Sequence, residues 1–115
     1  MAYDPGLAQM LRDALADLPI TEQKMFGGLA FLLHGHMVCG VHKGGVMVRV
    51  GKAAYPAALD LPGVTPMMFG AKPMVAMVDV SDAAVEDDGI RGQLLAIALA
   101  TIRDLPPKVA KPKKG

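Results

Sequence analysis

Three pairs of turn-forming residues divide the stretch from Thr21 to Val50 into short runs, and this spacing constrains the fold more than any other feature. The pairs are Gly27-Gly28, His34-Gly35 and Gly44-Gly45. The runs between them are rich in apolar and β-branched residues, as strands are. Tight turns between such runs connect neighbouring antiparallel strands. The stretch therefore predicts a β-meander.

Helical patterns lie on both sides of this meander. Asp4 and Pro5 are suited to an N-cap and a first helical position, and apolar residues then recur at helical spacing as far as Leu18. Residues 52–60 favour a short second helix, although Pro56 is compatible only with about the first turn.

Two more strands and a last helix follow. Residues 65–69 and 73–80 flank a Gly-Ala-Lys connection and have the composition of strands. After the acidic residues 86–88, an apolar pattern of helical spacing continues to Arg103. The predicted order of elements is α-β-β-β-α-β-β-α. We expect a single domain over residues 1–107 and a flexible basic tail over residues 108–115.

Composition narrows the class of protein. The chain of 115 residues is 52% hydrophobic, but glycine, proline and charged residues interrupt every apolar run before it could span a bilayer. A single cysteine and the absence of a secretion signal at the start predict a cytoplasmic location and no contact with membranes. The net charge of +1 gives no general attraction to nucleic acid, so such a role would depend on local clusters.

Residues 34–42 hold all three histidines and the cysteine, which raises the question of a metal site. If His34-Gly35 forms a turn, strand alternation places Cys39 on one face and both His36 and His42 on the other, roughly 20 Å apart. Zinc requires ligands at about 2 Å from one point. The sequence therefore predicts no metal site here and an inert, buried Cys39.

The same alternation predicts two faces for the sheet, with Phe31 opposite Val38 and His42 opposite Met47. The expected core face carries Ala30, Leu32, Met37, Cys39, Val41, Val46, Val48 and Val50. The other face carries Leu29, Phe31, Leu33, Val38, Gly40 and Met47 beside His36, His42 and Arg49. That second face is too apolar to be left in water, which favours a subunit or partner interface there. The alternative is that other elements of the chain cover it.

No arrangement of catalytic residues is evident. Ser81 is the only serine and has no G-x-S-x-G setting, and the histidines are expected to point away from Cys39. The glycines of residues 45–53 and the acids of residues 79–88 do not match the spacing of phosphate or calcium loops. We therefore expect no enzyme activity, no catalytic residues, no cofactor and no metal.

Several motifs give the chain a resemblance to the N-terminal domain of the TfoX/Sxy family, bacterial proteins linked to control of natural competence. These motifs are Lys24-Met25-Phe26-Gly27-Gly28, Phe31, the Gly35 turn, Cys39-Gly40-Val41 and Met47-Val48-Arg49-Val50. The resemblance covers about residues 3–108. It implies an α+β fold in two layers, in which helices pack on an antiparallel sheet of about five strands.

The resemblance also implies a function. Full-length relatives act as transcriptional coregulators alongside the cyclic-AMP receptor protein rather than as enzymes. We therefore expect a small regulatory or protein-interaction domain that forms a homodimer and contacts a regulator or a component of the transcription machinery.

The candidate residues for partner binding combine charged, aromatic and glycine positions. They are Lys24, Phe26, Gly27, Gly28, Phe31, Val38 and Arg49, with Arg49 the first choice. The two glycines are also open to a purely structural interpretation, as a bend between strands. The alternative function is direct binding of nucleic acid by lysines of the tail, aided by Lys24 and Arg49. These lysines are Lys108, Lys111, Lys113 and Lys114.

Overall fold

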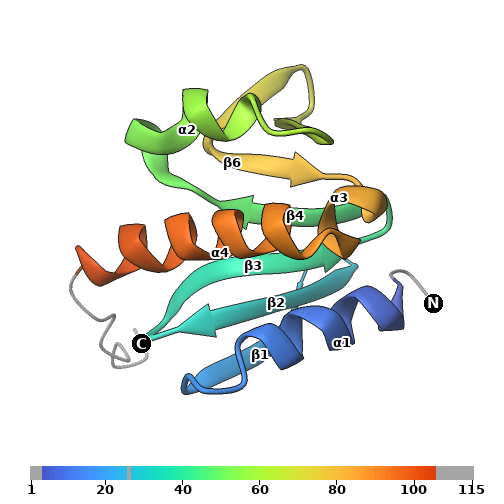
Figure 1. Ribbon diagram of the computed structural model, residues 1–115, viewed down its shortest axis with the longest axis vertical. Coiled ribbons are helices and arrows are strands. Elements are labelled where there is room, and N and C mark those ends of the chain that lie inside the picture. The colour runs from blue at the N-terminus through green and yellow to red at the C-terminus, as the bar shows by residue number, and fades with distance from the viewer. Residues whose placement is uncertain (1–3, 26, 106–115) are drawn as a thin grey trace, which may run out of the picture.

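One antiparallel sheet and four helices make up the part of the chain that the computed structural model describes, residues 4–25 and 27–105 (Figure 1). The helices are α1 (Pro5–Ala14), α2 (Gly51–Leu59), α3 (Asp82–Glu86) and α4 (Asp88–Arg103). The strands are β1 (Ile20–Met25), β2 (Gly28–Leu33), β3 (His36–His42), β4 (Gly45–Arg49), β5 (Val64–Phe69) and β6 (Lys72–Val80).

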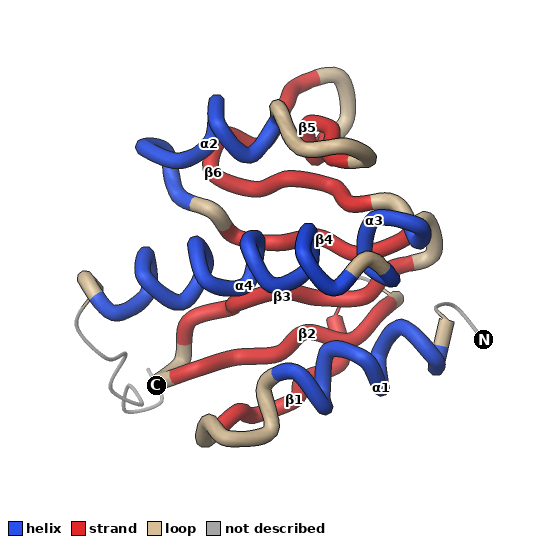
Figure 2. Tube along the Cα trace, viewed as in Figure 1, coloured by secondary structure: helices blue, strands red, loops and turns tan. Residues whose placement is uncertain are grey.

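The sheet has six strands in the order β1-β2-β3-β4-β6-β5, and every neighbouring pair is antiparallel. Figures 1 and 2 show all four helices on the same side of this sheet. The two-layer α+β class predicted from the sequence is therefore confirmed. No described helix is long and apolar enough to cross a membrane.

Three details of the predicted order differ from the structure. The meander holds one strand more than expected, because β1 forms in a polar segment that lacks the apolar alternation of its neighbours. A one-turn helix, α3, follows β6, with the Ser81 hydroxyl accepting a hydrogen bond from the Ala84 amide as its N-cap. Helix α1 ends at Ala14, one turn before the apolar pattern ends at Leu18.

A β-bulge in β3 determines which side chains face the helices. The turn at His34-Gly35 forms as predicted, with both residues at positive φ and Leu33 opposite His36. The register then shifts, because Met37 pairs with Leu32 whereas the next residue of β2, Phe31, pairs with Cys39. Two residues of β3 thus oppose one position of β2, as in a bulge.

Because of the bulge, the side chains of β2 lie on the opposite faces of the sheet from those predicted. Phe31 was expected opposite Val38, on a face away from the core. Instead Phe31, Val38 and Cys39 are all 0% exposed and belong to the core beneath the helices. The alternate residues Ala30 and Leu32 face the other side of the sheet. Val38 is the extra residue of the bulge, so it and Cys39 point in the same general direction.

The next hairpin also differs in register. Its turn consists of Lys43 and Gly44, with His42 opposite Gly45, whereas the sequence predicted Gly44-Gly45 and His42 opposite Met47. The shift is an even number of residues, so the side chains of β4 keep their predicted faces.

Two side-chain contacts attach the helices to the sheet. Arg12 of α1 donates hydrogen bonds from Nε and Nη2 to the two carboxylate oxygens of Glu22 on β1, at 2.5 and 2.8 Å. These bonds lower the pKa of Glu22. Thr101 of α4 donates to the carbonyl of Val50 at 3.0 Å, and its side chain packs against Gly51 at the start of α2.

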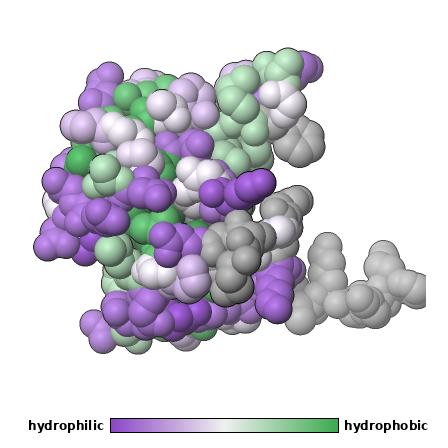
Figure 3. Space-filling model, turned by 90° about the vertical axis from the view of Figure 1, so that its right-hand side faces the viewer, coloured by the Kyte–Doolittle hydropathy of each residue, from purple (hydrophilic) through white to green (hydrophobic). Residues whose placement is uncertain are grey.

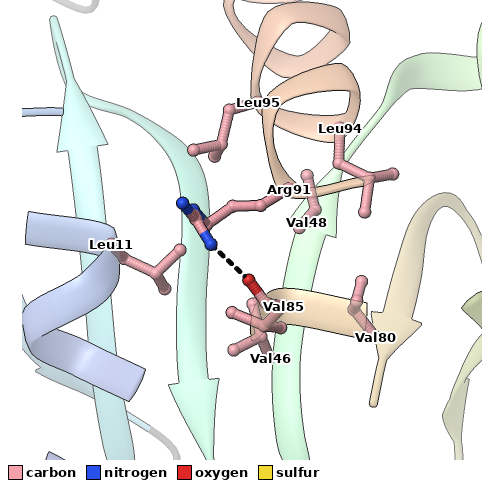
Figure 4. Close-up of a pocket in the computed structure, with 8 residues that line it drawn as sticks. All are labelled: Leu11, Val46, Val48, Val80, Val85, Arg91, Leu94 and Leu95. Carbon is pink, nitrogen blue, oxygen red and sulfur yellow. Dashed lines mark hydrogen bonds between the residues drawn. The ribbon is translucent and has the colours of Figure 1, made fainter. Parts of the chain in front are cut away.

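The helix side of the sheet is closely packed. Figure 4 shows one small cavity, where Leu11, Val46 and Leu94 meet, with a volume of about 10 Å³. The guanidinium of Arg91 lies at its edge and donates to the carbonyl of Val85 at 2.7 Å. Such a volume is at the lower limit for one water molecule and the lining is mostly apolar, so this gap is not a ligand site.

Substitution of two neighbouring residues tests this assignment of faces. Phe31→Ala should lower the free energy of unfolding by about 3–5 kcal/mol, because it leaves a cavity under the helices. Leu32→Ala should cost less than about 1.5 kcal/mol, because Leu32 is only partly buried and lies on the other face. Urea denaturation of both variants measures the difference. Equal losses, or a larger loss for Leu32→Ala, would contradict the bulge.

Candidate functional site

The side of the sheet away from the helices is called the open face here, because no described helix packs on it (Figures 1 and 2). Strand alternation and register place nine central residues of β2, β3, β4 and β6 on it. They are Ala30, Leu32, Met37, Gly40, His42, Met47, Arg49, Met77 and Asp79. The open face is therefore largely apolar across its centre, an unusual composition for a sheet surface in water.

A groove runs over the β3, β4, β6 and β5 part of the open face, with a volume of about 640 Å³. Its apolar lining consists of Ala76 and six methionines, Met37, Met47, Met67, Met68, Met74 and Met77. Its polar lining consists of His42, Lys43 and Arg49. The groove therefore combines an apolar surface of flexible methionine side chains with basic side chains.

The β5–β6 hairpin forms one wall of the groove. Figure 2 shows β5 almost end on, running back from the helix layer, and Figure 3 shows a pale green surface at this end of the molecule. Met68 and Met74 are exposed on this wall, at 49% and 37%, whereas Met47 and Met77 form a buried floor. The methionine lining thus extends from the sheet onto the hairpin.

Two irregularities bend the hairpin into this position. The register between β5 and β6 shifts between Pro66 and Met68. Ala76 has a φ of 91°, a conformation that costs a residue with a side chain about 1–3 kcal/mol. The carbonyl of Ala76 accepts a hydrogen bond from the amide of Val50 at 2.8 Å, which holds the strained residue against the end of β4.

Gly40 makes room for the floor of the groove. A Cβ atom at this position would lie 3.0 Å from the terminal methyl of Met47, so the methionine side chain lies across the glycine. The neighbours Cys39 and Val41 point to the opposite side, into the core. Glycine at this position leaves room for the Met47 side chain and for the carbonyl oxygen of Leu29, which would lie 3.1 Å from the same Cβ atom.

Arg49 carries a charge that no described residue neutralises. Its Nε is buried and has no hydrogen-bond partner within residues 4–25 and 27–105. The ion pairs of this part of the chain do not include it. A buried donor without a partner costs about 1–3 kcal/mol, and more when the group is charged. Because Arg49 lines the groove, an anion bound there would neutralise its charge.

Asp79, the acidic residue near Arg49 on the open face, already pairs with His42. Asp79 lies opposite Met47, two pairs along from Arg49 and Met77, but its Oδ1 is 2.8 Å from Nε2 of His42. His42 reaches across β4 where Gly45 has no side chain. Nδ1 of His42 accepts a hydrogen bond from the amide of Gly44 at 3.0 Å, so Nε2 is the nitrogen that donates to Asp79.

One protein-family model matches the residues that form most of these elements. The family model described as the TfoX N-terminal domain matches residues 13–102. The chain belongs to this family. Neither the curated proteins nor the solved structures contain a significant match. The matched residues of the TfoX N-terminal domain include the whole sheet and every residue that lines the groove.

The glycines of the family motif have structural roles in this TfoX N-terminal domain. Gly27 has a φ of +75° and lies in the connection between β1 and β2. A Cβ atom on Gly28 would collide with the carbonyl oxygen of Val41, so glycine permits the close approach of β2 and β3. Phe26, the aromatic residue of the motif, lies outside the described residues.

The structure does not bring the remaining candidate residues together. Lys24 lies opposite Leu29, a core residue, and is therefore on the helix side of β1, whereas Arg49 is on the open face. Phe31 and Val38 are fully buried in the core, so of the two alternatives left by the sequence, coverage by other elements of the chain holds for these residues. Lys108, Lys111, Lys113 and Lys114 lie outside the described residues.

The histidine-rich segment is divided between the two faces. His34 is exposed in its turn, and His42 is on the open face. His36 is opposite Leu33 on the helix side and is 9% exposed, so the expectation that it shares a face with His42 was wrong. Within the described residues, no three side chains of histidine, cysteine, aspartate or glutamate lie close enough to hold a metal ion.

Sequence reasoning missed the methionine groove. A signal was present, because six of the nine methionines lie between positions 37 and 77. Those residues come from the four strands β3, β4, β5 and β6. Only the position of β6 between β4 and β5 brings them side by side.

Cys39 provides a chemical test of the core. Burial raises the pKa of its thiol to about 12, so the folded protein holds almost no thiolate near neutral pH. The native chain should therefore react with Ellman's reagent at least about a hundredfold more slowly than the chain unfolded in guanidinium, as absorbance would show. Rapid reaction of the native protein would contradict the placement of Cys39 beneath the helices.

Proposed function

We propose that this TfoX N-terminal domain is a non-enzymatic regulatory domain of transcription that acts by binding other proteins through its open face. The single observation that supports this most is the presence of apolar side chains on a sheet face that no described helix covers. Leu32 and Met37 are partly exposed there, and neither belongs to the core cluster. Apolar surface of this kind is stabilised by association with another protein.

The composition of the open face favours binding over catalysis. Methionine side chains are flexible and polarisable, so they adapt to partners of different shape. The nucleophile candidates are used elsewhere, since the Ser81 hydroxyl caps α3 and Cys39 is buried in the core. The proposal of a non-enzymatic domain rests on these two assignments.

The transcriptional part of the proposal rests on family membership. Full-length members of the TfoX/Sxy family act as coregulators of competence genes, and the match to the N-terminal domain covers residues 13–102. A regulator or a component of the transcription machinery is therefore the class of partner we propose. The lysine tail would at most add electrostatic attraction to DNA, because phosphate contacts position a protein without specifying sequence.

The first partner we propose is a second copy of the chain. The β2–β3 part of the open face, with Leu32 and Met37 at its centre, could pack on the same surface of another molecule around a twofold axis. Such a contact is isologous, so one apolar patch serves both subunits. It replaces the interface expected around Phe31 and Val38, which lie in the core.

Substitution of Leu32 tests self-association. Leu32→Glu places a charge in the centre of the proposed contact, so a dimer should dissociate at least about tenfold more readily, a change of about 1.4 kcal/mol. Gln93→Glu on the exposed surface of α4 introduces the same charge on the helix side and should have no effect. Sedimentation velocity over a range of concentrations measures both.

Two results would contradict this part of the proposal. One is a wild-type chain that remains monomeric at about 100 μM, a concentration above the dissociation constant of most specific dimers. The other is a wild-type dimer whose stability Leu32→Glu leaves unchanged while circular dichroism shows that the variant is folded.

A further inference from the structure

We propose that the groove of the open face is a binding site for a medium-chain monocarboxylate, with the carboxylate on Arg49 and the alkyl chain along the methionines. This inference concerns a different part of the open face from the proposed Leu32 contact, because Leu32 does not line the groove, although Met37 borders both. It assigns to the domain a small-molecule ligand in addition to its protein partners.

The charged end of the ligand follows from Arg49. The guanidinium is planar and always protonated, and its N–H groups match the two oxygens of a carboxylate. Arg49 lines the groove and takes part in no ion pair within residues 4–25 and 27–105. Asp79 does not compete for it within the chain, because His42 holds that carboxylate at 2.8 Å. The position is therefore prepared for an external anion.

The apolar body of the ligand follows from the lining. Six methionines surround the groove, and their unbranched thioether chains can pack along an unbranched alkyl chain without a fixed shape. The volume of about 640 Å³ lies within the range of about 300–1,000 Å³ that small-molecule sites occupy. Part of the floor, Met47 and Met77, is shielded from water before any ligand binds.

Charge and polarity exclude other classes of occupant. Arg49 and Lys43 disfavour a cationic ligand, and they also disfavour residues 106–115 of the same chain, which contain four lysines. A nucleotide carries several phosphate charges and a polar sugar, whereas the groove offers one partly buried guanidinium and a mostly apolar lining. A single carboxylate with an apolar chain satisfies both features.

Methionine methyl signals provide a direct readout. The full chain, labelled with ¹³C at its methionine methyl groups, would be titrated with octanoate, and separately with 1-octanol and octyltrimethylammonium as ligands of matched chain length. We expect octanoate to shift the signals of groove methionines such as Met47 and Met77 in a saturable way. Met10, which packs on α1 against the core, should not shift.

The ligand series is informative without any variant. We expect octanoate to bind at least about tenfold more tightly than octanol, and octyltrimethylammonium to bind least. Equal shifts with octanoate and octanol would overturn the proposal, because the groove would then recognise only an alkyl chain. Shifts of Met10 equal to those of the groove methionines would overturn it as well, since they would indicate a detergent effect.

Substitution of Arg49 separates the carboxylate from the chain. Arg49→Gln keeps a polar side chain but removes the charge, and should weaken octanoate binding at least about tenfold while changing octanol binding less than about twofold. Arg103→Gln, at the exposed end of α4, removes the same charge elsewhere and should have no effect. A folded Arg49→Gln variant that binds octanoate as tightly as the wild type would overturn the proposal.

Discussion

The β-bulge in β3 determines how the rest of this structure is arranged. Val38 and Cys39 together oppose Phe31, so all three side chains are buried in the core next to one another. The helices pack on this side because the apolar side chains of β2, β3, β4 and β6 all converge there. Without the extra residue, β2 would expose Phe31 and bury Leu32, and the core would lose its largest fully buried side chain.

The open face is the other consequence of the same arrangement. Once the helices cover one side, the alternate residues of β3 and β4 face away from them, and the β5–β6 hairpin turns part of this surface into a groove. Gly40 admits the side chain of Met47, and the pairing of His42 with Asp79 leaves Arg49 with an unneutralised charge. The proposed interaction surface thus depends both on a glycine that makes room and on a histidine that pairs with the nearby acid.

Local features of the sequence were sufficient to predict the class of fold and most elements. The turn at His34-Gly35 and the last helix follow from short-range conformational preferences. The sequence could not predict which side chains of β2 face the core, because no residue type marks Val38 as the extra residue of a bulge. Arg49 was identifiable as a charged residue in an apolar strand. Its missing partner and the groove around it depend on the long-range pairing of β4 with β6.

The most direct test of the central claim is peroxide oxidation of the methionines, followed by mass spectrometry at protein concentrations below and above self-association. If the open face is the interaction surface, oxidation of Met37 should slow as the chain associates, while Met10 on the helix side should be unaffected. If sedimentation shows association and the oxidation rate of Met37 stays the same at both concentrations, the open face is not the surface through which this domain binds.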